Sequence, residues 1–153
     1  MTSAAGSDAP GADPRAALDA YLMLVRDGRV LMGRRHNTRF ASNQWLLPAG
    51  RVEPGETVLA AAIREAREEI GLALAPEALR LVYVMHARWQ QLPRVGFFFA
   101  VKDWDGEPVN AEPDKCSVIA WHPLAALPEE TVDYARVALA DIAAGRPLGF
   151  WGW

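Results

Sequence analysis

The sequence has one cysteine, no long hydrophobic run and no excess of positive charge. The single Cys116 excludes an internal disulfide, and the absence of an H-E-x-x-H pair argues against a zinc site. The longest strongly apolar stretch, residues 95–101, is far shorter than the roughly 20 residues that a membrane-spanning helix needs. We therefore predict a soluble protein in a reducing, cytoplasmic setting, with no membrane partner.

The net charge of -3 provides no overall positive field to hold long nucleic acid. The 153 residues, 51% of them hydrophobic, suffice for one globular domain, which we place at residues 17–145. Residues 1–16 lack the basic and apolar regions of a signal peptide and are expected to form a flexible tail. Residues 146–153 form an aromatic tail that either folds back on the domain or covers a partner subunit, so a homodimer is one of two expectations.

Hydrophobic periodicity and turn residues predict a mixed β-sheet with helices packed on it, an α/β sandwich. Asp27 and Gly28 separate two apolar runs and indicate a hairpin, because glycine accepts a positive φ in the turn. The expected elements, in chain order, are a strand pair over residues 18–35, a long loop with a short strand over 36–56, a helix over 57–70, strands over 79–89, 94–104 and 116–124, and a helix over 128–145.

Three glutamates lie close together on the helix expected over residues 57–70. At 100° per residue, an apolar stripe includes Leu59, and Glu65, Glu68 and Glu69 fall at about 240°, 180° and 280° from that residue. The carboxylates therefore form one patch beside the edge of the buried stripe. Arg64 is placed to pair with Glu68 as an i, i+4 neighbour, so the patch is only partly neutralised.

Local electrostatics opposes this arrangement. Glu65 and Glu69 repel each other as an i, i+4 pair at a cost of about 0.2–0.5 kcal/mol, and the helix dipole disfavours anions in the last turns. A solvated charged face is one explanation for such a pattern. The other is a divalent cation, because clustered carboxylates are the oxygen ligands that Mg²⁺ and Mn²⁺ prefer.

The segment from Gly50 to Leu72 decides between these explanations. Gly50, Glu56 and the run "REAREEIGL" match the motif G-x5-E-x7-R-E-U-x-E-E-x-G-U at every specified position, with Ala66 as a small residue where a larger aliphatic is common. This motif is the Nudix box, and the chain resembles the MutT-like branch of the Nudix hydrolases. The resemblance implies a Nudix-type α/β/α sandwich with the box helix packed on the sheet.

The same resemblance implies roles for single residues. Glu65, Glu68 and Glu69 are implied to bind catalytic Mg²⁺, for which Mn²⁺ is able to substitute. The backbone carbonyl of Ala49 is a further candidate ligand. Arg64 is implied to orient the carboxylates, and Glu56 to support the same network.

The loop before the last expected strand carries Glu112, in a segment similar to one that supplies an extra metal ligand or base in MutT-type enzymes. Its alternative is an exposed acidic residue in a Pro-rich loop. The run from Glu112 to Trp121 also resembles that of enzymes that hydrolyse purine nucleoside triphosphates, including oxidised ones. The side chains expected at the substrate are four arginines and one tryptophan: Arg34, Arg35, Arg39, Arg51 and Trp89.

The sequence therefore predicts a divalent-metal-dependent enzyme that cleaves a nucleoside triphosphate to the monophosphate and diphosphate. Clustered metals suit that reaction, which needs neutralised charge and a placed water more than a covalent nucleophile. The proton acceptor remains open among Glu68, Glu69 and Glu112. Two alternatives stay open as well: a hydrolase of ADP-ribose or nucleoside diphosphate sugars, and a catalytically silent module that senses nucleotides.

Overall fold

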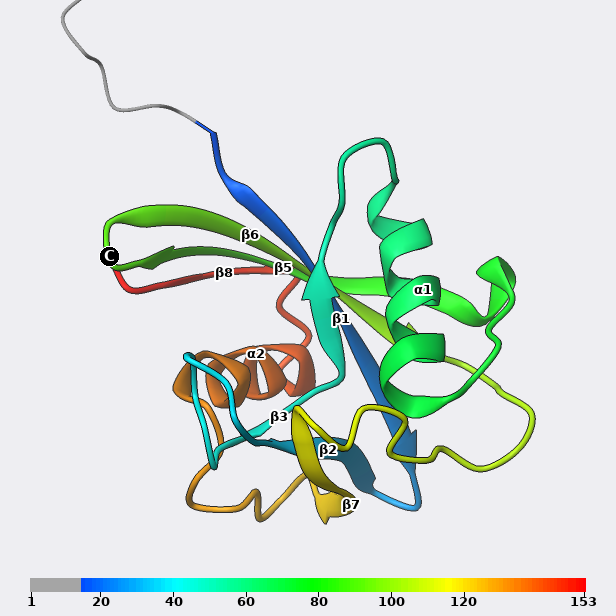
Figure 1. The fold of residues 1–153 in the computed structure, drawn as a ribbon. Helices are drawn as coiled ribbons and strands as arrows, with labels where there is room; N and C mark the ends of the chain where they lie inside the picture. The colour runs from blue at the N-terminus through cyan, green and yellow to red at the C-terminus, as the bar shows by residue number, and fades with distance from the viewer. Residues whose placement is uncertain (1–14) are drawn as a thin grey trace, which may run out of the picture.

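The computed structural model describes residues 15–153, so most of the predicted N-terminal tail lies outside the described residues. Within this range an eight-stranded mixed sheet lies between two α-helices (Figure 1), which confirms the predicted sandwich. The main sheet path runs β3-β2-β1-β6-β5-β8, with β4 on β1 and β7 on β2. The bounds are β1 Ala17–Arg26, β2 Arg29–Arg35, β3 Trp45–Leu46, β4 Ala49–Arg51, α1 Val58–Ile70, a 3-10 turn Pro76–Ala78, β5 Leu79–Trp89, β6 Leu92–Val101, β7 Cys116–Pro123, α2 Asp133–Ala143 and β8 Leu148–Trp151.

Strand β1 connects the two parts of the sheet. The predicted turn is present, with φ of 52° at Asp27 and 72° at Gly28. However, β1 pairs with β2 only at Val25 and Arg26, next to that turn. Most of β1 instead pairs in parallel with β6, and its first half also pairs with β4. The sequence could predict the hairpin but not this long parallel pairing, because the partner strand lies about 75 residues away along the chain.

Helix α1 begins and ends where the sequence predicts. The side chain of Thr57 accepts a hydrogen bond from the Ala60 amide, and Gly71 ends the helix with a φ of 69°. The buried face is rotated from the predicted stripe. Ala61 and Glu65 are buried, whereas Leu59 and Ile63 of the predicted stripe are only partly buried. Small alanines let the helix approach the sheet closely, and this brings Glu65 onto the side that faces β4.

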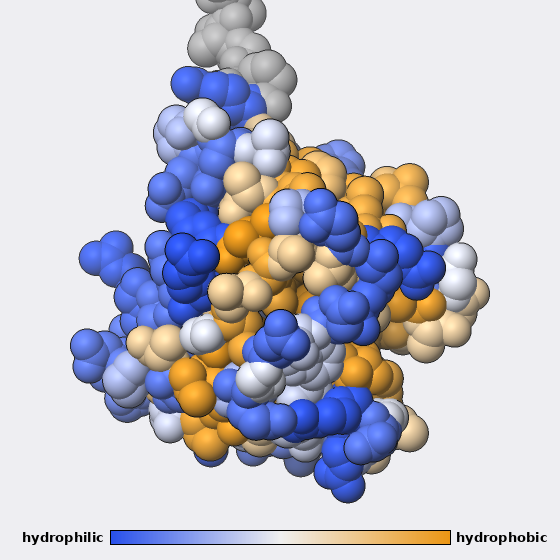
Figure 2. Space-filling model, turned by 90° about the vertical axis from the view of Figure 1, so that its right-hand side faces the viewer, coloured by the Kyte–Doolittle hydropathy of each residue, from blue (hydrophilic) through white to orange (hydrophobic). Residues whose placement is uncertain are grey.

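A hydrophobic core lies on each face of the sheet. One is centred on α1 and includes Leu22 and Ile70, and the other lies under α2 and includes Tyr83 and Leu139. On the α1 side of the molecule (Figure 2), hydrophobic residues reach the surface in patches between hydrophilic ones. No helix within residues 15–153 combines the length and hydrophobicity that crossing a bilayer requires.

The aromatic C-terminal segment folds back on the domain as strand β8, parallel to β5. Trp151 is partly buried, whereas Phe150 and Trp153 are about 60% exposed, so the segment folds back but leaves two of its aromatic rings largely at the surface. The Phe150 side chain points to the opposite face of the sheet from Trp151 because side chains alternate along a strand. Trp153 follows the strand and packs against His86. At the strand's inner face, Tyr83 donates a 2.6 Å hydrogen bond to Asp141 of α2.

Gly149 is expected to be essential for this docking of β8. A Cβ atom at this position would overlap the Tyr83 hydroxyl and the Asp141 carboxylate. We expect Gly149→Ala to reduce the free energy of unfolding by about 1–3 kcal/mol, the usual range for overpacking. Tyr83→Phe in the same chain should restore part of this loss, as measured by chemical denaturation. An unchanged stability of Gly149→Ala would contradict the close packing.

Candidate active site

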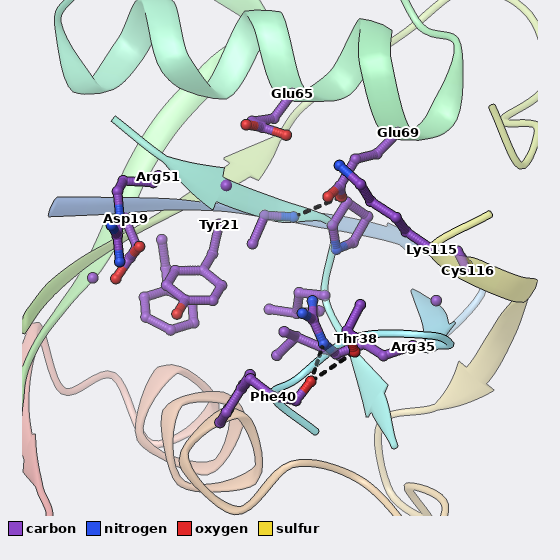
Figure 3. Close-up of a pocket in the computed structure, with 18 of the residues that line it drawn as sticks. Asp19, Tyr21, Arg35, Thr38, Phe40, Arg51, Glu65, Glu69, Lys115 and Cys116 are labelled. Atoms are coloured by element: carbon purple, nitrogen blue, oxygen red, sulfur yellow. Dashed lines mark hydrogen bonds between the residues drawn. The ribbon is translucent and has the colours of Figure 1, made fainter. Parts of the chain in front are cut away.

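The residues before α1 are fitted closely against its glutamates. The Ala49 amide donates a 2.9 Å hydrogen bond to Oε2 of Glu69. At the next residue, Gly50, a Cβ atom would overlap the carboxylate of Glu65, so a glycine is required there. Both glutamates point from α1 into one cavity (Figure 3). Ala49 and Gly50 thus fix where the carboxylates of Glu65 and Glu69 lie.

Arg64 connects the acidic side chains of the box. Its guanidinium donates to both carboxylate oxygens of Glu56, at 2.7 and 3.1 Å, and to Oε1 of Glu65 at 2.7 Å. The predicted i, i+4 pair with Glu68 is also present, at 3.1 Å. A further bond to the carbonyl of Arg51 ties this network to β4. The helical spacing indicated the Glu68 contact, and the bonds to Glu56 form because the loop before α1 folds against the helix.

Burial disfavours the ionised form of Glu65 and Glu69. It raises the pKa of Glu69 to about 8, against the opposing hydrogen bond from Ala49, and the charge of Glu65 adds to the rise. Burial also raises the pKa of Glu65, although Arg64 opposes it. The charge of Glu112, which lines the same cavity, adds to the rise of both pKa values. The repulsion predicted from the sequence is therefore present in the fold.

These residues have the chemistry of a hard-cation site. Over residues 15–153 no three carboxylate, imidazole or thiolate groups already converge on one point, because Arg64 holds Glu68 and the Ala49 amide holds Glu69. The donors are nevertheless carboxylate oxygens whose mutual repulsion a divalent cation would relieve. Glu65, Glu69 and Glu112 all line the same cavity, so this donor set fits Mg²⁺ or Mn²⁺.

The cavity has a volume of about 590 Å³ and extends well beyond the glutamates. Its far side is aromatic: Tyr21 stacks on Phe98 with ring centroids 4.4 Å apart, and Phe40 packs edge-on against Trp89 at 4.8 Å. Trp151 of β8 stacks on Trp89 at 5.9 Å. Acidic groups at one end and flat rings at the other suit a ligand that carries both phosphates and an aromatic ring.

The structure brings three of the five predicted substrate residues to this cavity. Arg35, Arg51 and Trp89 line it. Arg34 is instead directed to the carbonyl of Asn43, and Arg39 is exposed in the loop. Adjacent residues on a strand face opposite sides of the sheet, so Arg34 and Arg35 could not both point inward.

Several lining residues were not predicted. Lys115 follows the loop of Glu112 and also lines the cavity, to which it adds a cation. Cys116 is partly buried, donates to the carbonyl of Val118 and has a pKa that burial raises. The polar pair Asp19 and Arg94 also lines the cavity. The one signal for Asp19 was a charge in an otherwise apolar strand.

Acidification should stabilise the metal-free protein. The pKa of Glu69 in the folded state, about 8, is above its ordinary value of 4.5, so the folded state binds the proton more tightly. The resulting contribution to the free energy of unfolding is complete below pH 4.5, declines above it and is lost once the pH exceeds about 8. We expect a higher melting temperature at pH 6.5 than at pH 8.5 in EDTA. Glu69→Gln should reduce that difference, and an undiminished difference in this variant would show that Glu69 is not its source.

The comparisons with known proteins agree with the geometry. The family model described as NUDIX domain matches residues 13–142, which include the whole box. The chain belongs to the Nudix hydrolase family. The crystal structure of a MutT Nudix hydrolase from Burkholderia pseudomallei superposes on this chain with a TM-score of 0.75. The two sequences are 30% identical, and the match covers 82% of this chain and 97% of that one. The prediction of a MutT-like Nudix fold is therefore confirmed.

Two curated relatives are named by their substrates. The human 8-oxo-dGDP phosphatase NUDT18 is 34% identical over 111 residues, which are 69% of this chain and 32% of the relative. The 8-oxo-dGTP diphosphatase of Escherichia coli K12 is 28% identical over 86 residues, 56% of this Nudix chain and 65% of the relative. The chain thus spans about a third of the length of the human relative.

Proposed function

We propose that this Nudix protein is a divalent-metal-dependent pyrophosphohydrolase that cleaves a nucleoside triphosphate to the monophosphate and diphosphate. One observation carries the proposal: the carboxylates of Glu65, Glu69 and Glu112 and an aromatic wall share one cavity of about 590 Å³. The carboxylates suit phosphates with their cation, and the aromatic wall suits a nucleobase. The relatives named for 8-oxo-dGDP and 8-oxo-dGTP support an oxidised purine nucleotide as the substrate.

In the proposed reaction, Glu65, Glu69 and Glu112 would hold Mg²⁺, or Mn²⁺ in its place, and Glu68 and the Ala49 carbonyl are further candidate ligands. Such an ion neutralises phosphate charge and makes bound water more acidic. Arg64 keeps the carboxylates in position through its bonds to Glu65 and Glu68. The cationic side chains of Arg35 and Lys115, which line the cavity, are placed to attract the phosphates.

The bond changes are those of a simple hydrolysis. A water oxygen forms a bond to phosphorus, the bridging P–O bond breaks, and the diphosphate leaves with the bond's electron pair. A carboxylate takes the proton of the water, and Glu68, Glu69 and Glu112 are its candidates. In the metal-free protein burial raises the pKa of Glu69 to about 8, so Glu69 must release its proton before it can bind the cation or accept the proton of the water.

A nucleoside diphosphate is a second candidate substrate. The observation that favours it is the similarity to NUDT18, whose name specifies 8-oxo-dGDP. The carboxylate end and the aromatic end of the cavity suit a diphosphate and a triphosphate alike. Measuring the reaction products therefore decides which of the two is the substrate. Hydrolysis of ADP-ribose or a nucleotide sugar, and nucleotide sensing without catalysis, are the remaining alternatives.

The test is a panel of dGTP, 8-oxo-dGTP, dGDP, 8-oxo-dGDP, ADP-ribose and a nucleoside diphosphate sugar with Mg²⁺, with products separated by anion-exchange chromatography. We expect an 8-oxo-purine triphosphate to give the monophosphate and pyrophosphate. Faster cleavage of the diphosphate, with orthophosphate released, would favour the second candidate. Turnover of ADP-ribose alone would overturn both, and binding without any turnover would indicate a sensor.

A further inference from the structure

A buried ion pair lies in the substrate cavity, away from the glutamates. Asp19 of β1 is only 6% exposed. Arg94 of β6 donates to both of its carboxylate oxygens, from Nε at 2.8 Å and from Nη2 at 2.5 Å. Both residues line the cavity. In Figure 3, Asp19 lies at the opposite side of the drawn pocket from Lys115, with Tyr21 between them.

The fold does not need this pair to hold its strands together. Strands β1 and β6 already pair in parallel along eight residues, from Ala17 with Arg94 to Leu24 with Val101. Removing two charges from water costs several kcal/mol per ion, and replacing a buried pair by apolar residues is often neutral or stabilising. A charged pair on a cavity wall therefore suggests a role toward the cavity's contents.

Aromatic groups surround the pair. Tyr21 lies two residues along β1 from Asp19, and its ring stacks on Phe98. Its hydroxyl donates a 3.1 Å hydrogen bond to the hydroxyl of Tyr134. Gly96 lies opposite Asp19 in the parallel register, and a Cβ atom there would come within 2.9 Å of the Tyr21 ring. The glycine thus leaves room for the Tyr21 ring beside the ion pair.

The pair also keeps hydrogen-bonding capacity. A guanidinium has five N–H donors, of which Asp19 receives two, and a carboxylate has about four acceptor sites, of which Arg94 uses two. The pair therefore offers donors and acceptors side by side in one rigid plane. Nucleobase edges likewise carry hydrogen-bond donors and acceptors.

From these contacts we infer that Asp19 and Arg94 determine base specificity: they hydrogen-bond to the edge of the nucleobase while the aromatic residues contact its face. The inference rests on the proposed function, since it assigns the end of the substrate that points away from the glutamates. Different elements then hold the two parts of the substrate: the box helix holds the phosphates, and strands β1 and β6 hold the nucleobase. Base selectivity is thereby separable from hydrolysis.

The experiment compares wild type with Asp19→Asn combined with Arg94→Gln, which removes both charges and leaves neither unpaired. The substrates are dGTP, 8-oxo-dGTP, dITP, dATP and the triphosphate of deoxyribose without a base. The matched control neutralises an exposed bidentate pair, Arg26 and Glu107, by Gln at both positions. Melting temperatures of all variants are measured alongside, and Arg94→Lys serves as a second variant that keeps the charge but loses the planar donor fork.

We expect the double variant to lose about 10- to 100-fold in kcat/KM for the preferred nucleotide, mainly through KM, and its preference among bases to shrink to within about 3-fold. Turnover of the base-free triphosphate should change less than about 2-fold, and the exposed control should match wild type. An unchanged preference among bases, or an equal loss with the base-free triphosphate, would overturn the inference while leaving the proposed function intact. Failure of wild type to cleave any nucleotide would overturn both.

Discussion

Glu69→Gln is expected to lower kcat by about 100-fold or more while leaving the protein folded. Glutamine keeps an oxygen that can accept the Ala49 amide, so the contact between loop and helix persists. It removes the negative charge that the proposed site needs for its cation and for proton transfer. In the absence of metal the variant should be at least as stable as wild type at pH 8.5, because burial and Glu65 disfavour the charge on Glu69.

The control for this variant is Glu77→Gln, an exposed glutamate in the turn Pro76–Ala78. It removes the same charge far from the cavity, and its kcat should stay within about 2-fold of wild type. Steady-state kinetics on the preferred nucleotide and a thermal melt in EDTA decide the outcome. Full activity of Glu69→Gln would remove this residue from the proposed mechanism, and a lower melting temperature at pH 8.5 would contradict the electrostatic argument.

Arg64→Met should reduce both activity and stability. The substitution removes every bond that holds Glu56, Glu65 and Glu68 together and leaves a buried carboxylate at Glu65 without its cation. Breaking a fully buried ion pair costs 3–5 kcal/mol, and because the Arg64 side chain is 23% exposed we expect a smaller loss, about 2 kcal/mol. Displaced carboxylates should lower kcat/KM by about 100-fold.

Arg67→Met is the matched control for Arg64→Met. It makes the same change three residues along α1 on the exposed face, and its activity and stability should remain close to those of wild type. Stability is measured by urea unfolding at pH 7.5 and at pH 5.5. The penalty of Arg64→Met should be smaller at the lower pH, where Glu65 is more readily protonated. Equal effects of the two substitutions would show that the position of Arg64 has no special importance.

The Nudix box and its helix could be predicted because their signals are local. The spacing from Gly50 to Leu72 indicated the family, and the cap residues Thr57 and Gly71 gave the ends of α1. The sequence even indicated that Glu65 and Glu69 would repel each other. It could not show how deeply they are buried, because burial depends on how closely β4 approaches the helix.

Most of the aromatic end of the cavity could not be predicted, for a different reason. Asp19 and Arg94 are far apart in the chain and meet through the parallel register of β1 and β6. Trp151 reaches the cavity only because β8 pairs with β5. Local patterns contain no information about such registers. Arg34 lies outside the cavity for a local reason instead, because it and Arg35 are neighbours on β2 and face opposite sides of the sheet.

The central claim is that the carboxylate end of the cavity hydrolyses the phosphate anhydride of a nucleotide with a divalent cation. The most direct measurement is ³¹P NMR of 8-oxo-dGTP incubated with the protein in Mg²⁺, and again with excess EDTA. We predict pyrophosphate and 8-oxo-dGMP in Mg²⁺ and unchanged triphosphate in EDTA. Intact triphosphate under both conditions, or the same turnover in EDTA as in Mg²⁺, would contradict the claim.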